Sequence, residues 1–297
     1  MEKIKLAIIG VGLIGGSLGL CLKDKLGDDI FITGLCRTTK SMALAAELGA
    51  VDLATNNAEK VVGDADIIFL STPVLQIVPM VQEILPYLKK GAIITDAGST
   101  KEYLRNELKK ILPDDVFYVA GHPMTGREKS GVAAAKKDLF VGKAYVIVHD
   151  DSIPPEVCEK LLQVLRLTGA NFLTLPSATL HDKCASTISH VPHIAAAALV
   201  SLLTDSGEQM DSCLKLIGGG FRDTTRIASS NADMWADICM TNKNAIVFDI
   251  KRLQKILGDV AEAIEQGDRT AVHDYFAAAK KCRDGILERT TKIFDVN

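Results

Sequence analysis

The sequence predicts an α/β protein in which a mostly parallel β-sheet covered by helices is followed by a second, all-helical domain. Two observations lead to this fold class. Up to residue 175, short apolar runs rich in β-branched residues alternate with helical stretches, which is typical of a parallel sheet buried on both faces. From residue 176 to residue 297 helical spacing dominates and no convincing strand remains. We therefore expect one domain over 1–175 and another over 176–297.

The predicted elements follow from the length and spacing of the apolar runs. The strands are Leu6–Ile9, Ile30–Leu35, Ile67–Ser71, Ala92–Asp96, Val116–Ala120, Ala144–Val148 and Asn171–Leu175. The helices are Lys40–Leu48, Ile77–Leu88, Lys101–Ile111, Pro155–Thr168, Ser177–Asp205, Glu208–Ile217, Asn231–Gln266 (with a break) and Arg269–Phe294. The apolar run 188–203 is shorter than a membrane span needs, so we expect a buried helix there.

Composition excludes several classes of protein. The chain has 297 residues, of which 47% are hydrophobic and 24% charged, as in ordinary soluble domains. A net charge of -3 provides no field that attracts nucleic acid. The 7 cysteines are scattered, odd in number and without a CxxC pair, which predicts neither a disulfide framework nor a zinc knuckle and favours the cytoplasm. The uncharged run 6–22 resembles a signal peptide, but its glycines have the spacing of a phosphate-binding loop.

This glycine-rich loop directly follows the first predicted strand and opens a helix. Its residues include Gly10, Gly12, Leu13, Ile14 and Gly15. In such a loop the first glycine permits a tight turn, the second lets the backbone approach a pyrophosphate, and the third lets the helix pack closely on the sheet. The helix N-terminus then offers free N–H groups to the phosphates. We expect a Rossmann-type dinucleotide site; the alternative is a glycine-rich packing motif.

The end of the second predicted strand bears on the choice of cofactor. A site for NAD usually carries Asp or Glu there, to bind the ribose 2′-hydroxyl. This chain has Cys36 at that position, followed by Arg37, Thr38 and Thr39, which could hold a 2′-phosphate. The pattern favours NADP over NAD. The alternative is that Arg37 stacks on the adenine and that either cofactor is used.

Two polar segments end the third and fourth predicted strands. They are Ser71, Thr72 and Pro73, and then Ser99, Thr100 and Lys101. We expect the first to shape the loop on the nicotinamide side. The side chains of the second should face the crevice beyond the strand ends, where open α/β sheets bind ligands. Ser99 could instead, or in addition, be the N-cap of the following helix.

A lone histidine, His122, ends the apolar run 116–120 and begins a loop rich in glycine and charge. Pro123 restricts the backbone there, and Arg127 and Glu128 follow. A histidine at a strand end beside charged groups suits a site that moves a proton next to an anion. The alternative is a surface turn with a structural histidine.

The helical half adds two clusters of polar residues. His181, Asp182, His190 and His193 form the first, and the spacing of the last two could suit a metal. No cysteine or carboxylate nearby completes a plausible set of ligands, so we predict no metal.

The second cluster follows three consecutive glycines, 218–220, and contains Arg222, Asp223 and Arg226. Backbone and guanidinium groups placed in this way suit an anion pocket; the alternative is a solvated turn and helix start. Trp235 comes nine residues after Arg226 and could line the same pocket or belong to the core.

Together these segments resemble the prephenate/arogenate dehydrogenase family of tyrosine biosynthesis. The matching motifs span almost the whole chain in the family's order: GVGLIGGSLG at 10–19, DAGSTK at 96–101, GHPMTGREKSG at 121–131, SHVPH at 189–193, GGGFRDTTRIA at 218–228 and MW at 234–235. The resemblance implies an NAD(P)-dependent oxidative decarboxylation of a cyclohexadienol. A hydride leaves C4, the C4 hydroxyl gives up its proton, and loss of CO2 makes the ring aromatic without a metal.

The resemblance also implies roles for single residues. His122 would accept the hydroxyl proton, Ser99 would align it, and Arg226 would bind a substrate carboxylate. The pocket would be lined by His190 or His193, Arg127 and Trp235, with the tryptophan able to come from a partner subunit. Arg222, Asp223 and Glu128 would form an ionic gate. Arg222 departs from the lysine of many relatives, and Arg127 occupies a variable position where it could lower the pKa of His122 or bind the substrate side chain.

The resemblance implies a homodimer formed through the helical domain, a small-molecule substrate, and neither a nucleic-acid nor a membrane partner. No ACT domain or fused chorismate mutase is recognisable, so tyrosine feedback through an ACT domain is not expected. Prephenate is the expected substrate and arogenate the alternative. Two further alternatives are a 3-hydroxyacid dehydrogenase and a dinucleotide sensor without turnover. Lys243 is a weak match to the catalytic lysine of the 3-hydroxyacid dehydrogenases.

Overall fold

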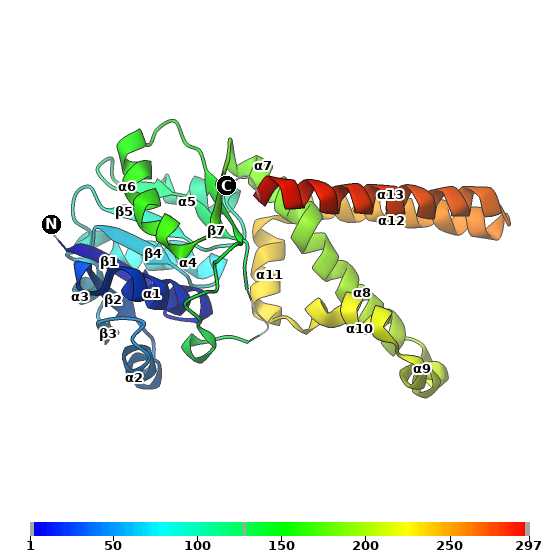
Figure 1. The fold of residues 1–297 in the computed structure, drawn as a ribbon, viewed down its shortest axis with the longest axis horizontal. Coiled ribbons are helices and arrows are strands. Elements are labelled where there is room, and N and C mark those ends of the chain that lie inside the picture. Colours follow the sequence, from blue (N-terminus) through cyan, green and yellow to red (C-terminus); the bar gives the residue numbers. More distant parts are fainter. Residues whose placement is uncertain (1–2, 127–128, 295–297) are drawn as a thin grey trace. The chain divides into compact units, whose positions relative to one another are not determined.

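The structure is a computed structural model that describes residues 3–126 and 129–294 (Figure 1). The chain forms two compact units that divide between Lys243 and Asn244. All β-strands and the helices up to α11 belong to the first unit, and the second unit is helical. A domain boundary at 175/176 therefore stays a prediction, based on the change in element type rather than on compactness.

A six-stranded parallel sheet organises the first unit. Its strands are β1 (Ile4–Ile9), β2 (Ile30–Leu35), β3 (Leu53–Thr55), β4 (Ile67–Leu70), β5 (Ile93–Asp96) and β6 (Phe117–Val119). Their order is β3-β2-β1-β4-β5-β6, so the chain changes direction across the sheet between β1 and β4. In doubly wound sheets the ligand crevice lies at this point, beyond the carboxyl ends of the strands. The predicted fold class is confirmed, while β3, only three residues long, was not predicted.

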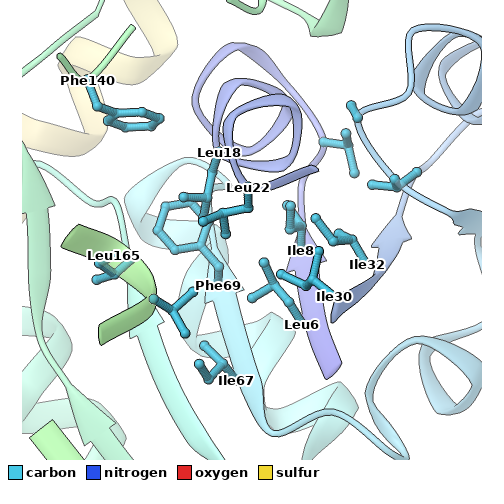
Figure 2. Packing of buried hydrophobic residues seen from close by; sticks show 14 of the residues in the cluster. Leu6, Ile8, Leu18, Leu22, Ile30, Ile32, Ile67, Phe69, Phe140 and Leu165 are labelled. Atoms are coloured by element: carbon cyan, nitrogen blue, oxygen red, sulfur yellow. The ribbon is translucent and has the colours of Figure 1, made fainter. Parts of the chain in front are cut away.

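Helices bury both faces of this sheet. On one face, Leu18 and Leu22 of α1 (Leu13–Leu26) point toward the strands that carry Ile8, Ile30 and Phe69, and all five side chains are buried (Figure 2). The other face is covered by α3 (Ala58–Val62), α4 (Val74–Ile84) and α5 (Glu102–Leu108). Each large aliphatic side chain buried in this way contributes about 1.5–3 kcal/mol.

A second, three-stranded sheet positions His122. It consists of β7 (Gly121–Pro123), β8 (Ala144–Val148) and β9 (Asn171–Leu175), with β7 antiparallel and β9 parallel to β8. The prediction that His122 begins a loop was therefore wrong, because it lies within β7, opposite Val146. Gly121 makes this path possible. A Cβ there would lie 3.0 Å from Asp96 O, a tighter contact than most side chains make, so glycine favours this close approach to β5.

The remaining helices of the first unit follow the predicted order, except for a short helix at the three glycines, which was not among the predicted elements. They are α2 (Thr39–Glu47), α6 (Pro155–Leu165), α7 (Ala178–Ala185), α8 (Val191–Thr204), α9 (Met210–Leu216), α10 (Gly219–Thr225) and α11 (Ala232–Thr241). A π-helical turn, Ser186–His190, joins α7 to α8. Such turns are frequent at functional sites. No strand follows Leu175 within the part of the chain that the structure describes.

The prediction of a buried helix over 188–203 was wrong for the single chain. Ile188, in the turn before α8, is 67% exposed and Leu202 of α8 is 70% exposed, because no described residue of the first unit covers them. The helical run Ala178–Thr204 is the one stretch of the described residues that is long and apolar enough to cross a membrane by length and composition.

The second unit contains α12 (Lys243–Glu265) and α13 (Arg269–Phe294). A turn at Gly267, whose φ of 67° favours glycine, connects them. Several large apolar side chains of these helices are exposed, among them Phe248 and Phe276.

Candidate active site

The glycine loop has the geometry that a dinucleotide requires. Gly10 has a φ of +89°, and a Cβ there would lie 2.9 Å from Thr72 Cγ2. A Cβ on Gly15 would lie 2.4 Å from Ser71 Oγ, so this glycine lets α1 pack closely on the strand ends. In contrast, a Cβ on Gly12 meets nothing within 4 Å, and Gly12 is the N-cap of α1, with Leu13 and Ile14 beginning the helix. Backbone at Gly12 is thus open for a phosphate at a helix N-terminus.

The segment after β4 holds this loop in shape. Ser71 Oγ donates hydrogen bonds to Gly10 O (2.8 Å) and Ile9 O (3.3 Å). Pro73 is the N-cap of α4. Thr72 Oγ1 is buried and has no hydrogen-bond partner among the described residues, so its hydroxyl is available to a ligand beside the glycine loop. The residues present therefore fit a bound dinucleotide.

The end of β2 carries no acidic side chain. Cys36 is buried, and burial raises the pKa of its thiol. Arg37, Thr38 and Thr39 are exposed beyond it. The hydroxyl of Thr38 already accepts a hydrogen bond from Ser41 N (3.1 Å) as part of the N-terminal capping box of α2. Arg37 and Thr39 remain the exposed candidates for a ribose phosphate.

His122 begins a buried chain of hydrogen bonds. Its Nδ1 lies 2.8 Å from Nε2 of His181 on α7, and Nδ1 of His181 lies 2.7 Å from Asp182 Oδ1. His122 is 8% exposed, and His181 and Asp182 are each 2% exposed. No described residue forms a hydrogen bond with Nε2 of His122, so this nitrogen keeps its capacity to form one.

Asp182 also caps the N-terminus of α5. Its two carboxylate oxygens accept hydrogen bonds from Lys101 N (2.8 Å) and Glu102 N (3.0 Å). The proposal that Ser99 is the N-cap was wrong, because Lys101 occupies the cap position and the capping carboxylate comes from α7. Ser99 is partly exposed, and its hydroxyl forms no hydrogen bond to His122 or to another residue of the described chain.

Thr100 and Lys101 do not face the crevice, contrary to prediction. Both are fully buried: Thr100 Oγ1 donates to Thr241 Oγ1 (2.9 Å), and Lys101 Nζ forms a short ion pair with Asp96. Lys101 Nζ also donates to Gly121 O (2.8 Å), and Tyr118 donates to Asp96 (2.8 Å). This ion pair ties β7 to the end of β5 and so fixes the position of His122.

Burial lowers the pKa of His122 well below its usual range, and the neighbouring His181, Lys101 and His190 lower it further. His122 is therefore neutral at neutral pH. A neutral histidine with a free Nε2 can accept a proton, which is the role expected of it.

The histidines of the SHVPH motif have different surroundings. His190 is 1% exposed, and Asn242 Nδ2 donates to its Nδ1 (3.2 Å). Burial lowers the pKa of His190 to about 4. His193 is only half-buried; its Nδ1 donates to Ser189 O (2.8 Å), and its ring stacks on Trp235 with centroids 4.0 Å apart. His193 is thus the more accessible of the two.

Trp235 belongs with these histidines in the same chain. Besides stacking on His193, it meets His190 edge-on at 5.9 Å, so no partner subunit is needed to bring it there. Its Nε1 is buried without a partner among the described residues. Arg226 is close enough for its charge to help burial lower the pKa of His193. The structure therefore brings Trp235, His193 and Arg226 together.

The predicted anion pocket corresponds to an open depression. It has a volume of about 620 Å³ and is lined by Leu214, Ile217, Phe221, Arg222, Thr225, Arg226 and Ser229. Arg222 and Arg226 both contribute cationic groups to it, while Asp223 is exposed and is not among the lining residues. The remaining predictions, Arg127 and Glu128, lie outside the described residues.

Sequence reasoning missed three buried groups of this site. Lys101 was expected to face the crevice, Asn242 was not considered, and the pair His181–Asp182 was placed in a cluster of polar residues without a role of its own. An adjacent histidine and aspartate in the sequence is a weak signal, and the partner of His181 is 59 residues away. The structure contains no group of potential metal ligands within its described part.

Comparison with known proteins agrees with this geometry. Residues 18–174 match the family model of the prephenate dehydrogenase nucleotide-binding domain, and residues 177–278 match the prephenate dehydrogenase dimerization domain. The chain is 35% identical over 285 residues to prephenate dehydrogenase of Bacillus subtilis, covering 96% of this chain and 76% of that protein.

Two solved structures are also similar. Prephenate dehydrogenase of Aquifex aeolicus, in complex with hydroxyphenyl propionate and NAD+, is 30% identical, with a TM-score of 0.88 over 96% of this chain and 99% of that one. Arogenate dehydrogenase of Synechocystis is 27% identical, with a TM-score of 0.81 over 95% and 100%. The chain belongs to the prephenate dehydrogenase family.

Proposed function

We propose that this protein is a prephenate dehydrogenase, which converts prephenate to 4-hydroxyphenylpyruvate by NAD(P)-dependent oxidative decarboxylation in tyrosine biosynthesis. The observation that carries the proposal is the neutral, buried His122, which has a free Nε2 and whose Nδ1 is bound to His181. A dinucleotide sensor without turnover would have no use for a buried proton acceptor held in this way. The 35% identity to a prephenate dehydrogenase over 96% of the chain supports the choice of substrate.

The glycine loop and His122 have separate roles in this reaction. The loop at Gly10, Gly12 and Gly15 would hold the phosphates of a bound dinucleotide, which would supply the acceptor for the hydride from C4. His122 Nε2 accepts the proton of the C4 hydroxyl as the C4 carbonyl forms. The ring carboxylate leaves as CO2 and the ring becomes aromatic, so the electrons balance without a further reactant.

We infer that the substrate carboxylate binds at Arg226, beside His193 and Trp235. Arg226 lines the open depression, and its guanidinium can form two parallel hydrogen bonds to a carboxylate. The buried Nε1 of Trp235 offers a further donor. Arg222 and Asp223 are exposed on α10, the helix that ends just before Arg226, which suits the role of an ionic gate.

We propose NADP as the preferred cofactor. The reason is the absence of a carboxylate at the end of β2, together with the exposed Arg37 and Thr39. The Aquifex aeolicus relative holds NAD+, so a preference for NADP would distinguish this chain from it.

We also propose a homodimer formed through the helical segments. The exposed apolar side chains of α8, α12 and α13 would be buried in a subunit interface, and residues 177–278 match a dimerization domain. The free state of all seven cysteines suits a cytoplasmic protein.

An assay of prephenate and arogenate, each with NAD and NADP, tests these proposals. The absorbance of the reduced nicotinamide reports turnover, and chromatography identifies 4-hydroxyphenylpyruvate or tyrosine as the product. We expect the highest kcat/KM for prephenate with NADP. A higher kcat/KM for arogenate would assign the alternative substrate, and no turnover of either would exclude both.

A further inference from the structure

The contacts behind His122 determine the direction of each hydrogen bond. Asp182 accepts at both carboxylate oxygens from the backbone N–H groups of Lys101 and Glu102, at 2.8 and 3.0 Å. An ionised carboxylate can only accept hydrogen bonds. Therefore Nδ1 of His181, 2.7 Å from Asp182 Oδ1, must carry a proton and donate it.

The direction of this hydrogen bond determines the direction of the next one, between His181 and His122. A neutral His181 that is protonated at Nδ1 has a bare Nε2, which can only accept. Nδ1 of His122, 2.8 Å away, must then be the donor. A neutral His122 with its proton on Nδ1 has its lone pair on Nε2, the nitrogen without a hydrogen bond in the described structure.

We propose that His181 and Asp182 are positioning residues that hold His122 as the Nδ1–H tautomer, so that Nε2 is always ready to accept the substrate proton. The proposal rests on the proposed function, because the Nδ1–H tautomer matters only if Nε2 accepts a proton from the substrate. In the reaction the substrate O–H bond breaks and an N–H bond forms at Nε2. The resulting imidazolium keeps its hydrogen bond to His181, and the negative charge of Asp182 stabilises it.

Several contacts make this arrangement rigid. The two backbone amides at the start of α5 hold the carboxylate of Asp182, and Asn242 Nδ2 donates to the backbone carbonyl of the same residue (2.7 Å). The groups close enough to influence the charge of His122 are His181, Lys101 and His190. Of these, only His181 forms a hydrogen bond with its ring.

Substitution of Asp182 by asparagine tests the direction of the bonds. When the amide oxygen takes the place of Oδ2 and accepts from Glu102 N, the NH₂ group takes the place of Oδ1, faces His181 and donates to Nδ1. His181 must then donate from Nε2, and His122 must accept at Nδ1 and carry its proton on Nε2. Imidazole ¹⁵N NMR distinguishes the two tautomers, and loss of a signal in His122→Asn assigns the resonances.

We expect wild-type His122 to be protonated at Nδ1 and Asp182→Asn to be protonated at Nε2. We expect kcat of Asp182→Asn to fall roughly 10²- to 10⁴-fold, as when a catalytic histidine is held in the wrong tautomer. KM should change less than about threefold, because substrate binding is not affected. A loss of folding would instead lower the cofactor affinity and the Tm.

Substitutions at His181 keep the test decisive if Asp182→Asn does not fold. His181→Leu removes the acceptor and should lower kcat roughly 10²-fold through misplacement of the base. His181→Gln offers an amide oxygen near the position of Nε2, so it should retain the Nδ1–H tautomer and most of kcat. This rescue would not be expected if the histidine only filled space.

The exposed pair His149–Asp151, whose Nε2 and Oδ1 lie 2.8 Å apart, provides the matched control. Asp151→Asn makes the same chemical change at the surface and should alter neither kcat nor the His122 spectrum. The proposal is overturned if wild-type His122 carries its proton on Nε2, or if His181→Leu keeps the wild-type kcat. If the wild type turns over neither substrate, the proposed function fails, while the NMR spectra still decide the direction of the hydrogen bonds.

Discussion

At the scale of single residues, Cys36 bears most directly on cofactor choice. We expect Cys36→Asp to lower the NADP/NAD ratio of kcat/KM about tenfold or more, because a carboxylate binds the ribose hydroxyl of NAD and repels a 2′-phosphate. The position is buried enough to raise the pKa of the thiol, so a lower Tm should accompany the change. Steady-state kinetics with both cofactors measure the ratio. Cys36→Ser, which adds no charge, should leave it unchanged, and an unchanged ratio in Cys36→Asp would remove Cys36 from this role.

His122 is the second decisive residue. We expect His122→Asn to lower kcat roughly 10²- to 10⁴-fold with a modest change in KM. Asparagine can still donate a hydrogen bond from Nδ2 to His181 but has no atom in place of Nε2, so the substitution removes the base and spares the contact behind it. Steady-state kinetics provide the measurement, with the exposed His149→Asn as control. Near-normal kcat in His122→Asn would exclude it as the proton acceptor.

At the scale of elements, two glycines of the same loop have different roles: Gly15 allows close packing, and Gly12 leaves room for a ligand. Gly15→Ala places a Cβ 2.4 Å from Ser71 Oγ and 2.7 Å from Gly10 O, and should lower the free energy of unfolding by about 1–3 kcal/mol. Gly12→Ala meets no atom within 4 Å and should keep the wild-type Tm. It should nevertheless weaken cofactor binding by at least about tenfold, since the added methyl group occupies the approach to the backbone. Thermal unfolding and cofactor titration of both variants test the difference, and equal cofactor affinity in Gly12→Ala and wild type would contradict it.

The elements also show how far sequence reasoning extends. The longer strands were predictable because their runs are apolar throughout, as a sheet covered on both faces demands. β3 and β7 were not, since three residues are too few to show a period and β7 contains Pro123. The role of His122 could be anticipated from its motif. Its contact with His181 could not, because it depends on the close approach of Gly121 to β5 and on the placement of α7 beside α5.

At the scale of the whole molecule, buried histidines should make the fold sensitive to acid. Burial lowers the pKa of His190 to about 4 and that of His122 well below its usual range, so the unfolded chain binds more protons than the folded one below pH 6.5. Their contribution to stability is therefore complete above pH 6.5 and is lost as the pH falls toward 4. For His190 alone the loss amounts to about 3 kcal/mol, at 1.36 kcal/mol per pH unit.

Urea unfolding between pH 7.5 and 4.5 measures this loss. We expect the free energy of unfolding of the wild type to fall steeply below pH 6.5, and His190→Gln to reduce the slope by up to one proton, or about 1.36 kcal/mol per pH unit. His149→Gln removes an exposed histidine and should retain the wild-type slope. If His190→Gln and His149→Gln have the same slope as the wild type, protonation of His190 does not limit stability in acid, and the loss must come from His122 or from other groups.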